Sequence, residues 1–140
     1  MVLTQHEADE LLNKAKEAIR KEVLSWGKTS RHDEPVIAIG EPDLQFVLVL
    51  SRNPFEIKAH FRTKSKNIQL ARIDTTKQHM NPDGQHIVGP HLHWYREGYA
   101  HLEWAEEIDW YDVNKPLDTL FKFLELIKTR FPKGVHEVLI

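Results

Sequence analysis

Segment 72–99 holds most of the side chains that could do chemistry. It reads RIDTTKQHMNPDGQHIVGPHLHWYREGY and contains four of the nine histidines, namely His79, His86, His91 and His93. Imidazole has an unperturbed pKa near neutrality, so it can serve as an acid, a base or a metal ligand. An activity of this chain is therefore expected to lie in this segment.

His91 and His93 form the strongest candidate pair. On a β-strand, residues two apart share a face, so both imidazoles can converge on one ion or one phosphate. The pair could bind a divalent metal, or it could act without metal in acid/base catalysis or anion binding. It could also be a structural pair in the sheet, and these three alternatives remain open.

The sequence Asn81–Gly84, which reads NPDG, predicts a turn between two strands. A three-residue loop with a glycine bulge would pair His79 with Ile87 and would send His79 and His86 to opposite faces. Only one of these two histidines can then join the candidate pair. We take His79 as the third catalytic candidate.

A second tight turn is expected at Gly98. A two-residue loop there would pair His93 with Leu102, and it would place Tyr95 and Trp104 on the same face as the two histidines. Tyr95 and Trp104 are therefore predicted to be ligand-binding residues beside the pair.

Charge is distributed unevenly along the chain. Residues 52–77 hold seven basic against two acidic side chains, a net of about +5, whereas residues 97–125 hold eight acidic against two basic ones, a net of about −6. The basic tract, with Arg72 as a ligand-binding residue, suits nucleic acid or another phosphate ligand. The asymmetry also suits self-association into a homo-oligomer, or simply two solvated faces.

The composition is that of one globular domain over residues 1–140, with a net charge of −2. No apolar run approaches the eighteen or so residues that a membrane span needs. The chain has no cysteine, which excludes disulfides and thiolate metal sites. The N-terminus does not resemble a signal peptide, so a cytoplasmic location is expected.

The elements that must position the histidines follow from hydrophobic spacing. A capping box at Thr4 and Glu7 starts a helix that is predicted to run to Trp26, before a loop over 28–34. Strands are predicted at 36–39, 44–50, 55–63, 68–74 and 138–140, and a second helix is predicted from Pro116. We expect the strand at 44–50 to be covered on both faces, and Phe55 and Phe121 to point into the core. The fold class is therefore α+β, an antiparallel β-meander flanked by an N-terminal and a C-terminal α-helix.

The pattern R-x-D … H-x-N-P-D-G … G-x-H-x-H-x-Y-R-E-G-Y within 72–99 resembles an uncharacterised family of small proteins from Gram-positive bacteria and their prophages. The chain departs from that pattern after Tyr99, where Ala100-His101 replaces a Gly-Asp-like pair. The family has no established activity. The resemblance implies a mobile-element setting, in which small nucleases, toxins and host-factor inhibitors are common.

Three functions fit these residues. The first is cleavage of phosphodiesters in nucleic acid, with His91, His93 and His79 as acid/base groups or metal ligands and with Arg72 holding phosphate. The second is a non-enzymatic binding or inhibitor protein that contacts its partner through the acidic, aromatic segment 103–112. The third is a structural metal site that ties the hairpins together.

Overall fold

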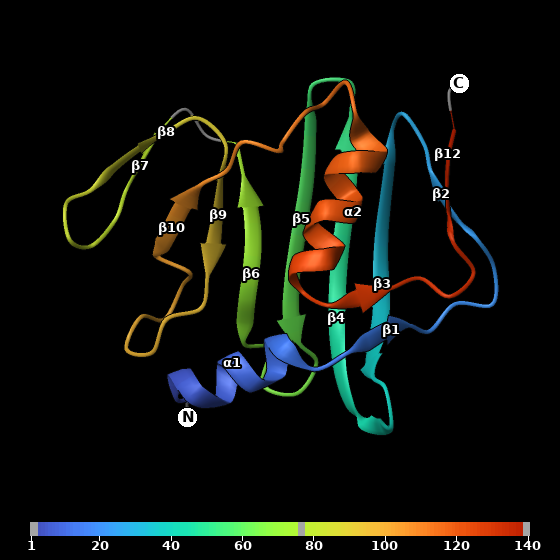
Figure 1. Cartoon of the computed structure of the whole chain (residues 1–140), viewed down its shortest axis with the longest axis horizontal. Helices are drawn as coiled ribbons and strands as arrows, with labels where there is room; N and C mark the ends of the chain where they lie inside the picture. The colour runs from blue at the N-terminus through green and yellow to red at the C-terminus, as the bar shows by residue number, and fades with distance from the viewer. Residues whose placement is uncertain (1–2, 76–77, 139–140) are drawn as a thin grey trace.

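The computed structural model describes residues 3–75 and 78–138. In chain order, the elements are α1 (Gln5–Asn13), β1 (Lys16–Ala18), β2 (Leu24–Trp26), β3 (Ser30–Ala38), β4 (Glu41–Asn53), β5 (Glu56–Thr63), β6 (Gln69–Asp74), β7 (Gln78–Met80), β8 (His86–Val88), β9 (His91–Trp94), β10 (Trp104–Glu107), α2 (Pro116–Leu126), β11 (Thr129–Arg130) and β12 (Val135–Glu137). In the described residues, eight strands form one sheet in the order β10-β9-β6-β5-β4-β3-β1-β11 (Figure 1). The strand pairs β2–β12 and β7–β8 lie beside it.

The α+β class is confirmed, but the simple antiparallel meander is wrong because the sheet is mixed. Strand β11 pairs in parallel with β1, and β12 pairs in parallel with β2. Both parallel partners follow α2, so the C-terminal segment returns across the sheet and joins strands from the N-terminal quarter (Figure 1). Because no short turn connects these parallel partners, local sequence does not predict their pairing.

The first helix begins as predicted but ends much earlier. Thr4 and Glu7 form the predicted capping box, yet α1 stops at Asn13. Within 16–18 and 24–26 every second side chain is buried, namely Lys16, Ala18, Leu24 and Trp26. Alternate burial fits a strand better than a helix, so β1 and β2 replace the predicted second half of the helix. The predicted loop at 28–34 is likewise wrong, since β3 begins at Ser30.

The central strands agree better with the sequence. Strand β5 alternates as predicted, with Ile57, Ala59 and Phe61 buried. Strand β4 is longer than predicted and buries only one face fully, since residues 47, 49 and 51 on its other face are half-buried. Phe55 is 87% exposed because it lies in the turn between β4 and β5, where the strand alternation has not yet started.

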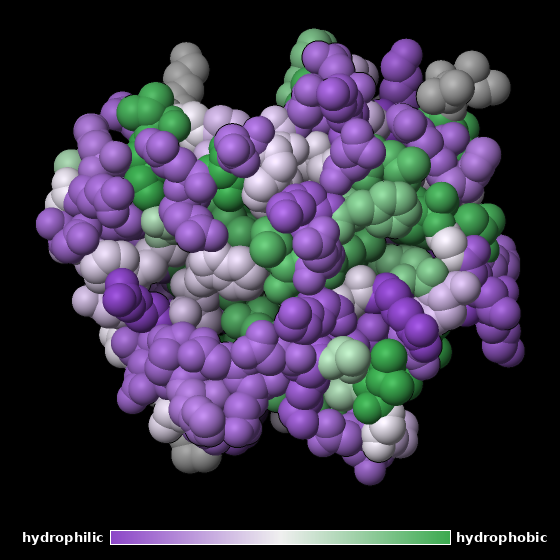
Figure 2. Space-filling model, viewed as in Figure 1, coloured by the Kyte–Doolittle hydropathy of each residue, from purple (hydrophilic) through white to green (hydrophobic). Residues whose placement is uncertain are grey.

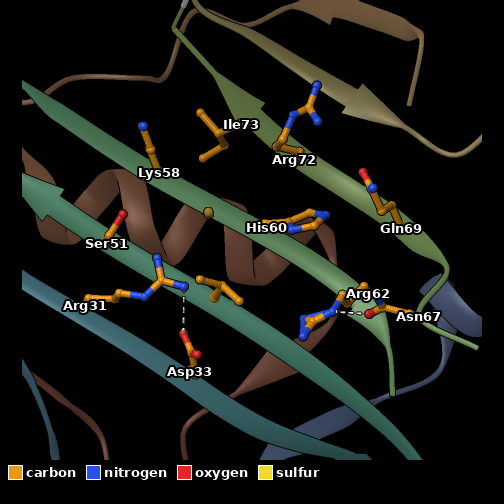
Figure 3. Close-up of a pocket in the computed structure, with 12 residues that line it drawn as sticks. Arg31, Asp33, Ser51, Lys58, His60, Arg62, Asn67, Gln69, Arg72 and Ile73 are labelled. Atoms are coloured by element: carbon orange, nitrogen blue, oxygen red, sulfur yellow. Dashed lines mark hydrogen bonds and ion pairs between the residues drawn. The ribbon is translucent and has the colours of Figure 1, made fainter. Parts of the chain in front are cut away.

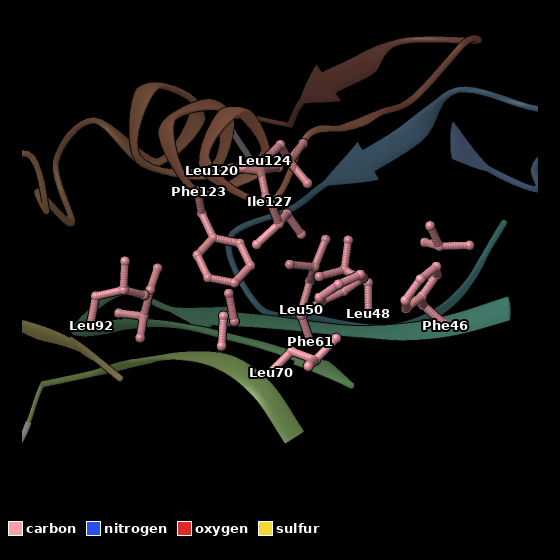
Figure 4. Packing of buried hydrophobic residues seen from close by; sticks show 14 of the residues in the cluster. Phe46, Leu48, Leu50, Phe61, Leu70, Leu92, Leu120, Phe123, Leu124 and Ile127 are labelled. Atoms are coloured by element: carbon pink, nitrogen blue, oxygen red, sulfur yellow. The ribbon is translucent and has the colours of Figure 1, made fainter. Parts of the chain in front are cut away.

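The core lies between α2 and one face of the sheet. Phe123 and Leu124 of α2, with Ile127 at its C-terminal end, lie over Leu50 and Phe61 of the central strands (Figure 4). Helix α2 begins at Pro116 as predicted. Phe121 is 45% exposed, so its predicted core position is wrong: the buried stripe runs through positions 120, 123, 124 and 127, and Phe121 lies beside it.

The predicted last strand at 138–140 lies mostly outside the described residues, since residues 139–140 are not described. The described C-terminal strand, β12, ends before it at Glu137. Neither helix in the described part of the chain is long and apolar enough to cross a membrane.

The two faces of the sheet differ in character. On the face that carries α2, apolar side chains gather around the helix, with polar side chains around them (Figure 2). On the opposite face, the outward positions of β3, β5 and β6 carry polar residues such as Arg31, His60 and Arg72. We call this second surface the open face.

Candidate metal centre

Strand β9 presents His91 and His93 on the open face. The strand pairs with β6, so that Arg72 lies opposite His93 and Asp74 lies opposite His91. Between the two histidines, Leu92 points the other way into the core under α2 (Figure 4). Although the open face carries no helix, the two imidazoles are only 0% and 2% exposed. Something beyond the sheet must therefore cover them.

The hairpin β7–β8 provides that cover. Its register is the one predicted from the Asn81–Gly84 turn, with His79 opposite Ile87 and Gly84 in the left-handed region at φ 89°. Ile87 is buried and His86 is exposed, so the two faces of the hairpin are distinct. The register therefore turns His79, and not His86, toward the histidines of β9.

Asn81 fastens the hairpin to the sheet. Its side-chain Nδ2 donates to the carbonyl oxygen of Ala105 at 2.9 Å, and its Oδ1 accepts from the backbone N–H of Ala105, also at 2.9 Å. Ala105 lies on β10 directly opposite His93. The sequence analysis missed this role, because the NPDG context already accounts for an asparagine as a turn residue.

The three histidines form one compact cluster. One ring nitrogen from each of His79, His91 and His93 lies within 4.8 Å of the corresponding nitrogens of the other two. The ring centroids are 4.7 Å apart for His79–His93, 4.8 Å for His91–His93 and 5.4 Å for His79–His91. We call these three residues the histidine cluster.

Each ring of the histidine cluster is oriented by a backbone carbonyl. His91 Nδ1 donates to the carbonyl of Gly89 at 2.8 Å, and His79 Nε2 donates to the carbonyl of Glu103 at 2.8 Å. His93 Nδ1 donates to the carbonyl of Leu102. A carbonyl oxygen only accepts, so each of these nitrogens carries a proton, and in a neutral ring the lone pair lies on the second nitrogen.

These second nitrogens are poorly satisfied. His91 Nε2 and His93 Nε2 are both buried and have no hydrogen-bond partner among the described residues. A buried polar atom without a partner costs about 1–3 kcal/mol. Burial, and then the positive charge of Arg72, lower the pKa of His93 to about 4, so its ring is neutral at pH 7. A neutral imidazole whose second nitrogen has a free lone pair is the form in which histidine binds a metal.

The histidine cluster is wider than the ligand set of a bound transition metal. In a tetrahedral zinc site with Zn–N bonds of about 2.0–2.1 Å, the nitrogens lie roughly 3.4 Å apart. The nitrogens of the histidine cluster, within 4.8 Å of each other, would have to approach by up to about 1.4 Å. His79 is half-buried on a two-stranded hairpin, so it is the ligand that can make this movement.

Two charged side chains of β6 border the cluster. Asp74 Oδ2 lies 3.7 Å from His93 Nε2, and Arg72 Nη2 lies 3.9 Å from the same carboxylate oxygen. The order along the open face is therefore imidazole, carboxylate, guanidinium. A water molecule at the cluster would have a carboxylate near it to accept a proton, and an anion would have a guanidinium near it.

The predicted register of the second hairpin is wrong. His93 pairs with Ala105 and Trp94 pairs with Trp104, so residues 95–103 form a wide loop instead of a two-residue turn. The turn at Gly98 does exist, since Tyr99 N–H donates to the Arg96 carbonyl at 3.2 Å. The strands do not resume directly after it, because Leu102 adopts a positive φ of 33°.

This register moves both predicted aromatic ligands away from the histidines. Trp104 lies opposite Trp94 and therefore on the other face of the sheet from His93, with the guanidinium of Arg96 4.0 Å from its ring. The Tyr95 hydroxyl donates to the carbonyl of Leu3. Both residues line a separate hollow of about 340 Å³, which the histidine cluster does not border.

Part of the acidic, aromatic segment 103–112 packs against the core. Ile108, Trp110 and Tyr111 pack against the core, and the Tyr111 hydroxyl accepts a hydrogen bond from the Ile57 N–H at 2.8 Å. The outward-facing part of the segment consists mainly of its carboxylates. A partner surface here stays a prediction.

Comparison with known proteins gives a family and no activity. No curated protein and no solved structure matches the chain. Residues 3–129, which include every residue of the histidine cluster, match a family of unknown function, DUF6978. The chain therefore belongs to the DUF6978 family.

Proposed function

We propose that this protein binds a divalent transition ion of the zinc type through His79, His91 and His93, and that it uses the bound ion for hydrolysis. The observation that carries the proposal is the orientation of the three rings. Each ring donates one N–H to a backbone carbonyl, and the three rings bring one nitrogen each within 4.8 Å of one another. Metal-binding histidines are held by outer hydrogen bonds of this kind.

Three protein ligands favour a reactive site over a purely structural one. Zinc sites that catalyse hydrolysis use three protein ligands and keep the fourth position for water, whereas structural sites use four. Asp74, 3.7 Å from His93 Nε2, would accept a proton from a water molecule bound in that position. Arg72, on the same strand face, would hold a negatively charged substrate.

A structural metal site is the second candidate, and the position of the Asp74 carboxylate favours it. If Asp74 itself became the fourth ligand, the site would be closed, and its role would be to fasten the β7–β8 hairpin to the sheet. Both candidates require metal binding, so they differ only in what Asp74 does.

Metal binding is tested by titrating Zn²⁺ into protein without a histidine tag and measuring the heat of binding. We expect one ion per chain, and a loss of affinity of at least about 100-fold in His91→Ala and in His93→Ala. His86→Ala is the matched control because His86 lies on the exposed face of the same hairpin. Equal affinity in wild type and both cluster variants would refute the proposal.

Asp74→Asn then separates the two candidates. A hydrolytic site should keep its zinc affinity within a few-fold and lose turnover of an activated phosphate ester such as bis(p-nitrophenyl) phosphate. A structural site should lose zinc affinity in this variant and should show no turnover in the wild type.

A further inference from the structure

A hollow of about 510 Å³ lies on the open face next to the histidine cluster. Its rim carries basic side chains from separate strands: Arg31 from β3, Lys58 and Arg62 from β5, and Arg72 from β6 (Figure 3). Arg31 and Arg72 are three strand spacings apart, or about 14 Å, and Lys58 and Arg62 are four residues apart, or about 13 Å. The basic rim is thus wider than a single phosphate group.

The cations of this rim are loosely paired. Arg31 lies 3.4 Å from Asp33, Lys58 lies 3.5 Å from Glu56, and Arg72 lies 3.9 Å from Asp74. Across residues 3–75 and 78–138, none of these three cations makes a side-chain hydrogen bond. By comparison, the pairs Arg20–Glu34 at 2.7 Å and Lys14–Glu41 at 2.8 Å are tight. The rim therefore retains hydrogen-bond donors for a ligand.

Arg62 differs from its neighbours because its Nε donates to the side-chain oxygen of Asn67 and not to a carboxylate. Between Arg62 and Arg72 lies His60, whose buried Nε2 has no hydrogen-bond partner in the described chain. Burial, and then the charges of Arg72 and Arg62, lower the pKa of His60. The middle of the hollow is thus a positive environment that contains an unsatisfied polar atom.

Arg72 links the hollow to the histidine cluster. Arg72 lines the hollow and is also paired with Asp74, which borders His93. A negatively charged ligand in the hollow would therefore extend directly to the proposed metal site.

We infer that the open face binds a single strand of nucleic acid through its phosphates, and that a phosphodiester of this strand is the substrate at the histidine cluster. The point of cleavage rests on the proposed metal site, but strand binding does not. The lining residues include no Phe, Tyr or Trp on which bases could stack. Recognition is therefore of the backbone, and it should be independent of base sequence and sensitive to salt.

The reaction that follows is hydrolysis. The oxygen of a water molecule bonds to phosphorus, and Asp74 accepts a proton from that water. The bond from phosphorus to one ester oxygen breaks, and the leaving oxygen takes up the proton that Asp74 accepted. One product ends in a phosphate monoester and the other in a hydroxyl group, so no oxidant or further reactant is needed.

Strand binding is tested by fluorescence anisotropy with a labelled twelve-nucleotide oligothymidylate in EDTA, at 50 and 200 mM salt. Four phosphate contacts predict a slope of about −3 in log affinity against log salt, or about 50-fold weaker binding over this range. The double variant Arg31→Ala/Lys58→Ala should show a slope of about −1.4 and only about a 7-fold change. Both side chains are about two-thirds exposed, so the variant should fold.

The matched control is Lys122→Ala/Lys133→Ala, which removes the same charge from half-buried Lys122 on α2 and exposed Lys133 after β11. It should keep the wild-type slope. A slope in the open-face variant equal to that of the control would overturn the inference. So would binding of inorganic pyrophosphate alone, with no affinity for the oligonucleotide.

The two proposals fail separately. A protein that binds zinc but not the strand overturns this inference and leaves the metal site intact. A protein that binds the strand in EDTA but neither binds zinc nor cleaves the strand supports the open face as a strand-binding surface and refutes the histidine cluster as a metal site.

As a second variant, Lys58→Glu reverses one rim charge and should weaken binding at 50 mM salt more than Lys58→Ala does.

Discussion

Lys16 and the histidine cluster are both buried polar groups packed against the sheet, but their hydrogen bonding is opposite. The Nζ of Lys16 donates to three backbone carbonyls, those of Leu12 at 3.0 Å, Lys14 at 2.8 Å and Ile127 at 2.9 Å. An ammonium group has three N–H donors, so every donor is used. In the histidine cluster, only one nitrogen of each ring makes a hydrogen bond within residues 3–75 and 78–138.

The difference shows how a buried polar group for folding can be told from one for a ligand. Lys16 joins the end of α1 to the end of α2 and leaves nothing for another molecule to satisfy. His91 and His93 each have a buried nitrogen that finds no hydrogen-bond partner in the described part of the chain. Such an atom destabilises the fold unless a ligand binds it. A substitution in the histidine cluster should therefore abolish stabilisation by added metal, whereas a substitution of Lys16 should not.

The largest expected effect is stabilisation by zinc. With free Zn²⁺ at about 1,000 times its dissociation constant, the free energy of unfolding should rise by about 4 kcal/mol. For a chain of this size, the melting temperature should rise by about 12 °C, and EDTA should reverse the shift. Differential scanning calorimetry with and without metal measures both.

Two variants sharpen this comparison. His91→Leu should lose the thermal shift, yet without metal its stability should stay within about 1 kcal/mol of wild type, because the substitution removes an unpartnered nitrogen along with one hydrogen bond. Lys16→Met should melt at a lower temperature but keep the full shift. A shift that survives in His91→Leu would show that the zinc binds elsewhere.

The next effect concerns Lys16 and pH. Burial, and then the charges of Lys128 and Lys14, lower the pKa of Lys16 to about 7 in the folded chain, against about 10.4 for an exposed lysine. Between these values the unfolded chain binds the additional proton, so stability should rise as the pH increases from 7 toward 10. Below pH 7 the full cost of burying the ammonium remains.

Lys16→Met removes this dependence and leaves the three carbonyls without their donor. At pH 9 Lys16 is a neutral amine with two N–H donors, so the variant should be about 2 kcal/mol less stable than wild type. At pH 7 the gap should narrow, because burial of the ammonium then destabilises the wild type. Urea unfolding at pH 7, 8 and 9 measures the difference in the free energy of unfolding between wild type and variant. Lys133→Met, at an exposed lysine, is the control. Parallel pH profiles for wild type and Lys16→Met would contradict the assignment.

The comparison also shows which parts of the site could be predicted from sequence. The NPDG turn fixed the hairpin register, because proline and glycine restrict the backbone locally, and that register selects His79 over His86. The alternation of β5 and the stripe of α2 were likewise visible in local spacing. These features depend on residues close together in the chain.

Features that depend on distant residues could not be predicted. The donors of Lys16 bond to Ile127, more than a hundred residues away, and the spacing of residues 15–26 satisfied a helix and two short strands equally well. The register of β10 depends on the conformation of a nine-residue loop, including the positive φ of Leu102. Trp104 was therefore assigned to the wrong face, and the approach of Asn81 to Ala105 was not foreseen.

The smallest expected effect concerns Asn81, whose side-chain hydrogen bonds among the described residues go to Gln85 and Ala105 and not to a histidine ring. Asn81→Ala removes both hydrogen bonds to Ala105, so the hairpin should no longer hold His79 against β9. Zinc affinity should fall about tenfold, as is common for residues that support a ligand. Asp83→Ala is the matched control, because Asp83 Oδ1 accepts from Gln85 N–H within the same turn and does not bond to β10.

Calorimetric titration of a double variant separates positioning from general damage. If Asn81 acts only by placing His79, then Asn81→Ala/His79→Ala should bind zinc as tightly as His79→Ala alone, since the second change has no ligand left to displace. If the two losses of affinity add instead, Asn81 supports β9 or β10 directly. The three-histidine cluster would then owe its shape to the sheet alone, and not to the hairpin that covers it.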